Sequence, residues 1–448
     1  MTKYDPKKWD HNVYGRRWGA YPTSEVFKNI DRTQYLFDRP SDVEYERRHK
    51  AVRKFMENRG LDCLIIQASP GGGRGWTNLR WMTNMIPFFS DNAFLVFPLK
   101  GEPTLYSGFQ WVVDPYRRAQ CIIEDVRGGY PPRDWARMIV DRIKELGYDK
   151  GKIGLVGLGY SQGKVSIEKP NFYIDSFPIN DLKIYDEAFP KAQFEFVTND
   201  WWQELRLIKS PEEIQFMEKA CEIGDKMVEA IVENVRPGMT EAQMFGIVHK
   251  RMYECGGTPI LLLLESTNTF RPNSAFHRPE AKNSVLQHGE CLHQEMWVGY
   301  CDGSYGSVGY TIFLGQPSKE YLEMSRLLLR CYEDVVNQLR PGKTNEDLEN
   351  AAFPLLEAGY ANDCPICWGI PGRNCRELPS VHVFPDPHGH HPDPFVLKPG
   401  MTPHVRLYPK STDFTRGVEI GEMWLITEGE PRCLNKFGDK YGRVVTVG

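Results

Sequence analysis

The feature that most constrains this 448-residue chain is a local pattern that occurs twice. A helix expected to begin at Ser210 and to run to about Asn234 is broken by Arg236-Pro237-Gly238, and a second helix follows. A helix expected over Tyr321–Leu339 is broken in the same way by Arg340-Pro341-Gly342. Serine is a natural N-cap, and Pro and Gly end helices at such breaks. Because the two breaks lie about 104 residues apart, they predict an internally duplicated domain.

The first part of the chain has a different pattern, in which short apolar strands alternate with helices. Helical spacing extends from Asp42 to Arg59, and Gly60 ends this helix. Such alternation predicts an α/β layer. The apolar runs expected as strands are Cys63–Gln67, Ala93–Pro98 and Lys152–Val156, and a helix is expected over Asp134–Leu146. We therefore expect an α/β (α+β) protein with an arm at 1–40, an N-terminal domain at 41–195 and a C-terminal domain at 196–448.

Composition and charge exclude several classes of protein. The formal net charge is −4, so no basic excess points to nucleic acid or to an anionic membrane surface. The sequence contains no run of 18 or more apolar residues, so we expect no transmembrane helix. The polar N-terminus lacks the apolar segment of a secretory signal. The 11 cysteines are scattered and odd in number, which favours reduced thiols in the cytoplasm. A cytoplasmic protein that binds neither nucleic acid nor a membrane is the expectation.

An ordered set of short motifs gives a closer comparison. In chain order these are Leu205–Glu213 (LRLIKSPEE), Arg236–Glu241 (RPGMTE), His277 within AFHRP, a strand pair ending at Gly315, Lys398–Met401 (KPGM) and Leu425–Gly429 (LITEG). As an ordered set they resemble the methionine aminopeptidase, prolidase and creatinase family, whose fold is called the pita bread. The resemblance implies a C-terminal pita-bread domain with pseudo-twofold duplication and a sheet inside an outer layer of helices. It also implies a homodimer in which residues 70–81 lie near the partner's pocket.

The resemblance places the family's metal-ligand positions on this chain. Most members hold two metal ions with two Asp, one His and two Glu. Arg406 brings a fixed positive charge to one of these positions, whereas hard divalent cations need several carboxylate or imidazole ligands. We therefore expect no metal cofactor; the alternative is a single metal held by Glu295, Glu422 and a histidine. The five matching positions are Glu295, Ser307, Trp368, Arg406 and Gly421.

Proton transfer is assigned to three residues. His277 matches the family's active-site histidine, and creatinase is the precedent within this fold for an imidazole that acts as general base and acid without a metal. Strand alternation gives His293 and Glu295 one face, so Glu295, with His293, is expected to orient a water or to abstract a proton. A thiol nucleophile is a further alternative, at Cys291, Cys301 or Cys375.

Substrate binding is assigned to charged residues and histidines. The guanidinium groups of Arg376 and Arg406 would clamp an anionic group by bidentate hydrogen bonds. The alternative is that these arginines pair with Glu295, Glu377 or Glu419, so that buried ion pairs replace the lost metal. The full set expected around the substrate is Arg376, Glu377, Arg406, His404, Glu419 and His382.

Together these residues indicate a metal-independent, creatinase-like enzyme. It would cleave a C–N, C–S or C–C bond of a small anionic or zwitterionic substrate, as a hydrolase or a lyase. One alternative is a lyase similar to the family's dimethylsulfoniopropionate lyases, because the spacing between Glu295 and Ser307 is similar to the spacing of the matching positions in those lyases. The others are a single-metal hydrolase and a non-catalytic binding module on the same fold.

Overall fold

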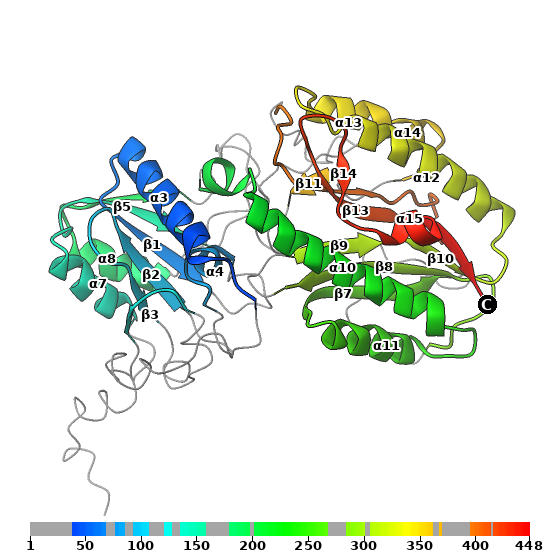
Figure 1. Ribbon diagram of the computed structural model, residues 1–448, viewed down its shortest axis with the longest axis horizontal. Helices are drawn as coiled ribbons and strands as arrows, with labels where there is room; N and C mark the ends of the chain where they lie inside the picture. Colours follow the sequence, from blue (N-terminus) through cyan, green and yellow to red (C-terminus); the bar gives the residue numbers. More distant parts are fainter. Residues whose placement is uncertain are drawn as a thin grey trace, which may run out of the picture. The chain divides into compact units, whose positions relative to one another are not determined.

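The computed structural model describes residues 38–68, 77–85, 93–106, 121–127, 135–157, 179–197, 201–267, 284–300, 305–361, 367–369, 395–413 and 415–448. These residues divide into two compact units, one that ends at Leu205 and one that begins at Arg206 (Figure 1). The sequence places this boundary near residue 195. Among the described residues, no helix is long and apolar enough to cross a membrane.

The N-terminal unit is built on a mixed six-stranded sheet of order β4-β3-β2-β1-β5-β6. β1 pairs antiparallel with β2 and parallel with β5. The strands expected at Ala93–Pro98 and Lys152–Val156 are confirmed with the same bounds as β2 and β5, and the strand expected at Cys63–Gln67 is β1. The six strands are β1 (Cys63–Ala68), β2 (Ala93–Pro98), β3 (Thr104–Tyr106), β4 (Asp125–Arg127), β5 (Lys152–Val156) and β6 (Gln193–Phe196).

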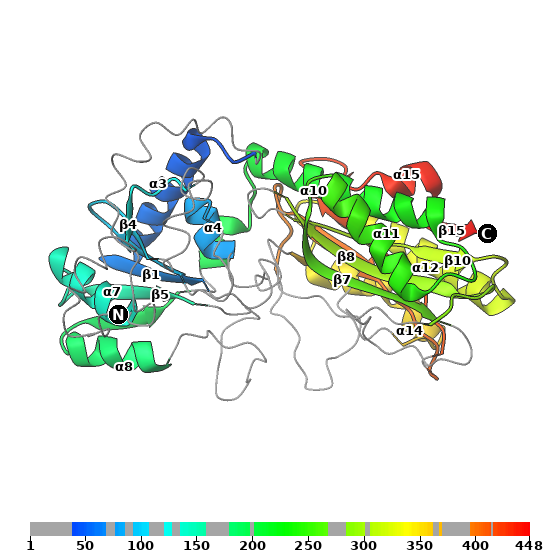
Figure 2. The same ribbon diagram turned by 90° about the horizontal axis from the view of Figure 1, so that it is seen from below.

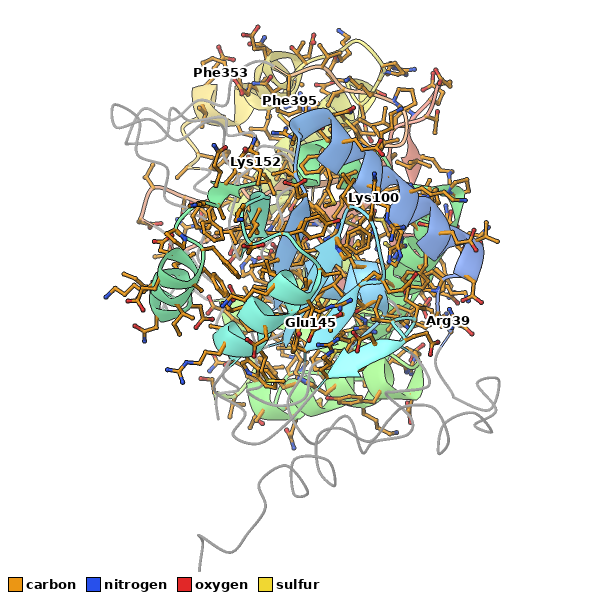
Figure 3. All side chains as sticks on the ribbon, turned by 90° about the vertical axis from the view of Figure 1, so that its left-hand side faces the viewer. Arg39, Lys100, Glu145, Lys152, Phe353 and Phe395 are labelled. Carbon is orange, nitrogen blue, oxygen red and sulfur yellow. The ribbon has the colours of Figure 1, made fainter. Side chains whose placement is uncertain are left out.

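The helices described in this unit are α3 (Asp42–Arg59), α4 (Thr77–Thr83), α7 (Trp135–Glu145) and α8 (Ile179–Ala188). Gly60 ends α3 with a φ of 65°, a left-handed conformation that glycine adopts without strain. Ile139 and Ile143 of α7 pack with Tyr185 of α8 in the apolar core of the sheet. Figure 3 draws the described side chains as sticks on the ribbon, with Glu145 of α7 labelled.

The C-terminal unit contains the predicted duplication. In each copy the glycine of the helix break has a positive φ, 92° at Gly238 and 86° at Gly342. Its backbone N–H donates to a leucine carbonyl, that of Leu286 at 2.8 Å and that of Leu397 at 3.1 Å. In both copies the turn at the helix break is therefore hydrogen-bonded to the leucine that precedes the site strand. The first copy has α10 (Pro211–Asn234) and α11 (Glu241–Glu254), and the second has α12 (Lys319–Asn337), α13 (Asn345–Ala352) and α14 (Pro354–Glu357).

The described strands of this unit form one sheet of order β11-β12-β13-β9-β8-β10-β15, with β7 paired to β8 and β14 paired to β13. Four of them carry the candidate site, namely β8 (Cys291–Gly299), β9 (Tyr305–Gly309), β12 (Pro403–Leu407) and β13 (Ile420–Leu425). The others are β7 (Thr258–Thr267), β10 (Thr311–Leu314), β11 (Cys367–Gly369), β14 (Arg432–Cys433) and β15 (Val444–Val447), and the short helix α15 (Phe437–Tyr441) precedes β15.

Alternate residues of these strands face opposite sides of the sheet. Met296 and Val298 of β8 pack in the core formed with α10 and α11, while Val405 and Leu407 of β12 pack in the core formed with α12 and α13. The helices thus lie outside the sheet (Figures 1 and 2). The residues between these positions point away from the helices, to what we call the inner face. The inner-face residues that matter below are His293, Glu295, Trp297, Tyr305, Ser307, His404, Arg406, Tyr408, Glu419 and Gly421.

Candidate active site on the inner face of the sheet

Neighbouring strands bring both copies of the duplication to one face. β8 pairs with β9, β9 with β13, and β13 with β12. The two copies also share a residue pattern, because Leu286–Glu295 reads LQHGECLHQE and Leu397–Arg406 reads LKPGMTPHVR. In both, a leucine and a glycine precede a buried histidine, and a buried charged residue follows two positions later. This internal equivalence of Glu295 and Arg406 is a sequence signal that motif comparison alone had missed.

The guanidinium of Arg406 bridges two buried carboxylates. Nη1 lies 2.8 Å from Oε2 of Glu295, and Nη2 lies 2.7 Å from Oε2 of Glu419. Nε also donates to Oε2 of Glu419, at 3.1 Å. The structure therefore brings together three residues that the sequence assigned to the site. Of the two interpretations offered for Arg406, it shows the buried ion pairs.

The remaining carboxylate oxygens are also held. The indole Nε1 of Trp297 donates to Oε1 of Glu295 at 2.9 Å, and the backbone N–H of Gln294 donates to Oε1 of Glu419 at 2.7 Å. The hydroxyl of Thr311 anchors the backbone of Glu419, because it bonds both its N–H and its carbonyl at 2.9 Å. Each carboxylate thus has a fixed orientation, since charge-assisted hydrogen bonds to rigid strands determine it. Trp297 and Thr311 were not among the residues expected from sequence.

The described residues do not fit the family's dimetal arrangement. Arg406 stands at one of the family's ligand positions and pairs its positive charge with Glu295, the carboxylate at another of them. A Cβ added at Gly421 would lie 3.0 Å from Nε2 of His404, so a carboxylate side chain fits there only if the imidazole shifts. Within the described ranges, no group of three or more His, Cys, Asp or Glu side chains is arranged to hold a metal ion.

Glu422 does not join Glu295. Its carboxylate accepts hydrogen bonds from the hydroxyls of Tyr310 (2.7 Å) and Tyr332 (2.9 Å) and from Nε of Arg443 (2.9 Å). Tyr332 belongs to α12, so Glu422 faces the helical side of the sheet and not the inner face. Glu422 lies opposite Val308, and Val308 lies opposite Met296, so Glu422 shares the face of Met296. Glu295 precedes Met296 on β8 and points to the other face, so the alternative of a single metal held by Glu295 and Glu422 is wrong.

The two inner-face histidines have different surroundings. Burial lowers the pKa of His404 to about 3, with a further contribution from the positive charge of Arg406. His404 is therefore a neutral imidazole at physiological pH, able to hydrogen-bond a substrate but not to carry charge. The ring of His293 lies 5.4 Å from that of Tyr408, between centroids. Both positions agree with the strand alternation used to place these histidines beside Glu295 and Arg406.

Two buried residues after β12 extend the inner face beyond the set expected from sequence. The guanidinium carbon of Arg406 lies 5.0 Å from the ring centroid of Tyr408, and Nζ of Lys410 lies 4.3 Å from the same ring. These are cation–π distances. Tyr408 and Lys410 follow His404 and Arg406 at intervals of two residues. This period of two is the sequence signal that predicts both of them on the inner face.

Several expected site residues are not placed by the structure. His277, Arg376, Glu377 and His382 lie outside the described residues, as do Cys301 and Cys375. Their assignments stay predictions. Cys291 is described, and burial raises its pKa well above the ordinary value. It therefore stays a protonated thiol, which is a poor nucleophile.

Known proteins match both units. Residues 48–208 match the creatinase/prolidase N-terminal domain, and residues 215–428 match metallopeptidase family M24. The Xaa-Pro dipeptidase of Pyrococcus furiosus is 28% identical over 245 residues, which are 53% of this chain and 66% of that protein, slightly less than two thirds of its length. The ectoine hydrolase of Halomonas elongata is 24% identical over 431 residues, which are 88% of this chain and 96% of that protein.

A solved structure shows the same fold over nearly the whole chain. The prolidase from Thermococcus sibiricus superposes with a TM-score of 0.71 at 18% identity, covering 91% of this chain and 100% of that one. At this identity the likeness shows the fold alone. The mixed α/β architecture expected from the sequence, an N-terminal domain followed by a pita-bread domain, is confirmed. The chain belongs to the creatinase/prolidase family, whose C-terminal domain has the pita-bread fold.

Proposed function

We propose that this protein is a metal-independent hydrolase that cleaves a C–N bond of a small anionic or zwitterionic substrate by acid–base catalysis. The observation that carries the proposal is the guanidinium of Arg406 between the carboxylates of Glu295 and Glu419. Two of these three residues stand at positions that align with metal ligands of the family. The named relatives are a dipeptidase and an ectoine hydrolase, which favours hydrolysis over the lyase reaction.

Arg406 gives the site a fixed positive charge without a metal. A buried ion pair is tolerated when its geometry is good and its remaining hydrogen-bonding groups are satisfied. Here Nε, Nη1 and Nη2 of Arg406 all donate to carboxylates, and Trp297 holds the second oxygen of Glu295. A carboxylate fixed in this way is suited to orienting a water, because it does not have to reorganise during the reaction.

The proposed reaction moves one proton in a cycle. His277 takes a proton from the attacking water, while the water oxygen bonds to the carbon of the scissile C–N bond. The imidazolium then gives this proton to the leaving nitrogen, the C–N bond breaks, and the protein returns to its starting protonation. Glu295 orients the water with His293 nearby, and His404 supplies a neutral hydrogen-bonding imidazole. Arg376, with Glu377 and His382, is assigned to the polar groups of the substrate.

The first test combines metal content with turnover. The purified chain is chelated exhaustively, analysed for bound metals, and assayed with ectoine and, separately, with an Xaa-Pro dipeptide. We expect ectoine hydrolysis to persist without bound metal, because the ectoine hydrolase aligns with 88% of this chain. The His277→Ala variant serves as the inactive control. Stoichiometric divalent metal, with turnover lost on chelation and restored by that metal, would overturn metal independence.

The oligomeric state, the class of substrate and the cellular location are proposed as well. The family resemblance supports a homodimer that binds a small-molecule substrate, and the scattered cysteines support a cytoplasmic location. A non-catalytic binding module is disfavoured, because five charged or imidazole side chains on the inner face are kept buried at considerable desolvation cost. These side chains are His293, Glu295, His404, Arg406 and Glu419.

A further inference from the structure

We propose that Ser307 is a positioning residue that holds the attacking water against Glu295, an inference that rests on the proposed hydrolase activity. Ser307 lies in the middle of β9, directly opposite Trp297 of β8 in the antiparallel register. Directly opposed residues share a face, and residues two apart on a strand share it as well. Ser307, Trp297 and Glu295 therefore lie together on the inner face.

The neighbours of Ser307 establish the direction of its side chain independently. A Cβ added at Gly306 would lie 2.5 Å from the backbone of Ala220 in α10, and Val308 is the nearest side chain to Gly224 of the same helix. Positions 306 and 308 thus face α10. Because strand residues alternate, the hydroxyl of Ser307 points away from that helix, toward the inner face.

The hydroxyl of Ser307 is buried and lacks a protein partner in the described part of the chain. Its residue is 0% exposed, and Oγ makes no hydrogen bond to any described residue. Leaving a buried hydroxyl without a hydrogen bond is costly, so native proteins usually satisfy it with a bound water, ion or substrate group. This cost makes a non-protein partner at Ser307 the physical expectation.

Glu295 supplies the second contact that such a water requires. One described donor bonds each of its oxygens, Trp297 at Oε1 and Arg406 at Oε2. A carboxylate oxygen accepts about two hydrogen bonds, so each retains capacity for one more. The hydroxyl-bearing ring of Tyr305 lies on the same face, two residues before Ser307, and is fully buried. Buried waters typically have two to four polar partners, and Ser307 and Glu295 provide two.

The arrangement determines how each group acts on the water. Its oxygen accepts a hydrogen bond from the Ser307 hydroxyl with one lone pair and directs the other lone pair at the scissile carbon. One of its hydrogens is donated to Glu295, and the other leaves to the general base of the proposed reaction as the new C–O bond forms. Ser307 keeps its own proton throughout. The serine stands at a position that aligns with an aspartate ligand of the family.

The test compares three variants of the full chain. Ser307→Ala removes the hydroxyl, Ser307→Thr keeps it, and Ser325→Ala removes a matched buried serine hydroxyl on α12 that likewise has no partner among the described residues. We expect Ser307→Ala to lower kcat by about 10- to 100-fold with KM little changed, since the loss concerns positioning of the nucleophile. Ser307→Thr should retain most of the kcat, and Ser325→Ala should match the wild type.

A crystal structure of the full chain provides a readout that does not depend on turnover. We expect an ordered water within hydrogen-bonding distance of Ser307 and Glu295 that is lost in Ser307→Ala. Absence of that water from the wild type, or an unchanged kcat in Ser307→Ala, would overturn the inference. If neither ectoine nor the dipeptide is hydrolysed, the proposed function fails, while the water in the crystal still decides whether Ser307 and Glu295 form this site.

Discussion

Arg406 carries a permanent charge into the interior of the sheet, where only 4% of its surface is exposed. Burying a charge is costly unless it is paired and hydrogen-bonded, and Glu295 and Glu419 provide both conditions. The same three residues would each be unfavourable alone. At the residue scale, stability and the proposed chemistry therefore depend on one network, which can be tested by removing its members separately and together.

Replacing Arg406 by methionine should destabilise the protein by about 3–5 kcal/mol, because two carboxylates are left buried without a counter-ion. The triple variant Arg406→Met/Glu295→Gln/Glu419→Gln should regain most of this loss, since no uncompensated charge remains. Urea unfolding followed by circular dichroism measures both. A triple variant as unstable as the single one would show that packing, and not charge, explains the effect.

His404 predicts a pH dependence of stability. Its folded pKa of about 3 is below the unfolded value of about 6.5, so the unfolded state binds more protons between these limits. Its contribution is fully present above pH 6.5 and is lost as the pH falls toward 3, with a slope of at most about 1.4 kcal/mol per pH unit. His404→Gln should flatten this part of the unfolding free-energy curve. Parallel curves for the variant and the wild type would contradict the assignment.

At the scale of elements, β9 is pressed against α10 through glycine. A Cβ at Gly306 would lie 2.5 Å from the backbone of Ala220 and Cys221, which is closer than side-chain atoms approach backbone. α10 itself begins at a capping box of Ser210 and Glu213, so its position is well defined at its N-terminus. The contact between strand and helix is thus set by the absence of a side chain.

Gly306→Ala should therefore destabilise the protein by about 1–3 kcal/mol or more, because the helix must move away from the sheet. It should also lower activity, since Ser307 follows directly on the strand. Gly429→Ala is the matched control, because a Cβ there would meet nothing within 4 Å. Thermal unfolding and kcat measured together decide this, and a Gly306→Ala variant as stable as the control would disprove the packing argument.

At the scale of the whole molecule, the two copies of the C-terminal unit contribute opposite charges to one site. Glu295 comes from the first copy and Arg406 from the equivalent place in the second. An internal duplication of this kind turns a pair of equivalent positions into a pair of neighbours. The site is consequently complete only when both halves are folded, which predicts that it forms cooperatively with the domain.

Quaternary structure is the prediction that belongs to this scale. The family resemblance leads us to expect a homodimer, with a mass in solution of twice the 51.7 kDa of one chain. Light scattering coupled to size-exclusion chromatography measures this mass directly. A monomer that retains full turnover over a wide concentration range would contradict the expected dimer and the role of residues 70–81 near a partner's pocket.

The periodicity of apolar residues was sufficient to predict many of the helices and strands, and the ordered motifs were sufficient to predict the family. The RPG breaks located both copies of the duplication, and apolar runs predicted β2 and β5 with their correct bounds. Strand alternation also placed His293 with Glu295, and His404 with Arg406, because a period of two follows from backbone geometry alone. Trp297, Thr311, Tyr408 and Lys410 were missed, since they belong to no motif and matter only through contacts across strands.

The sequence by itself determined the elements and the order of the family's motifs, because identity and spacing are local properties of the chain, and its alignment with the family's metal-ligand positions stays a prediction. Only the tertiary structure decided how the charged residues pair. Arg406 had two interpretations, substrate clamp or internal counter-ion; the register of β12 with β13 and of β8 with β9 brings it to the carboxylates with which it pairs, while a role toward a substrate stays a prediction. Glu422 was separated from Glu295 for the same reason. A partner more than 100 residues away along the chain is chosen by strand order and register, which no local pattern specifies.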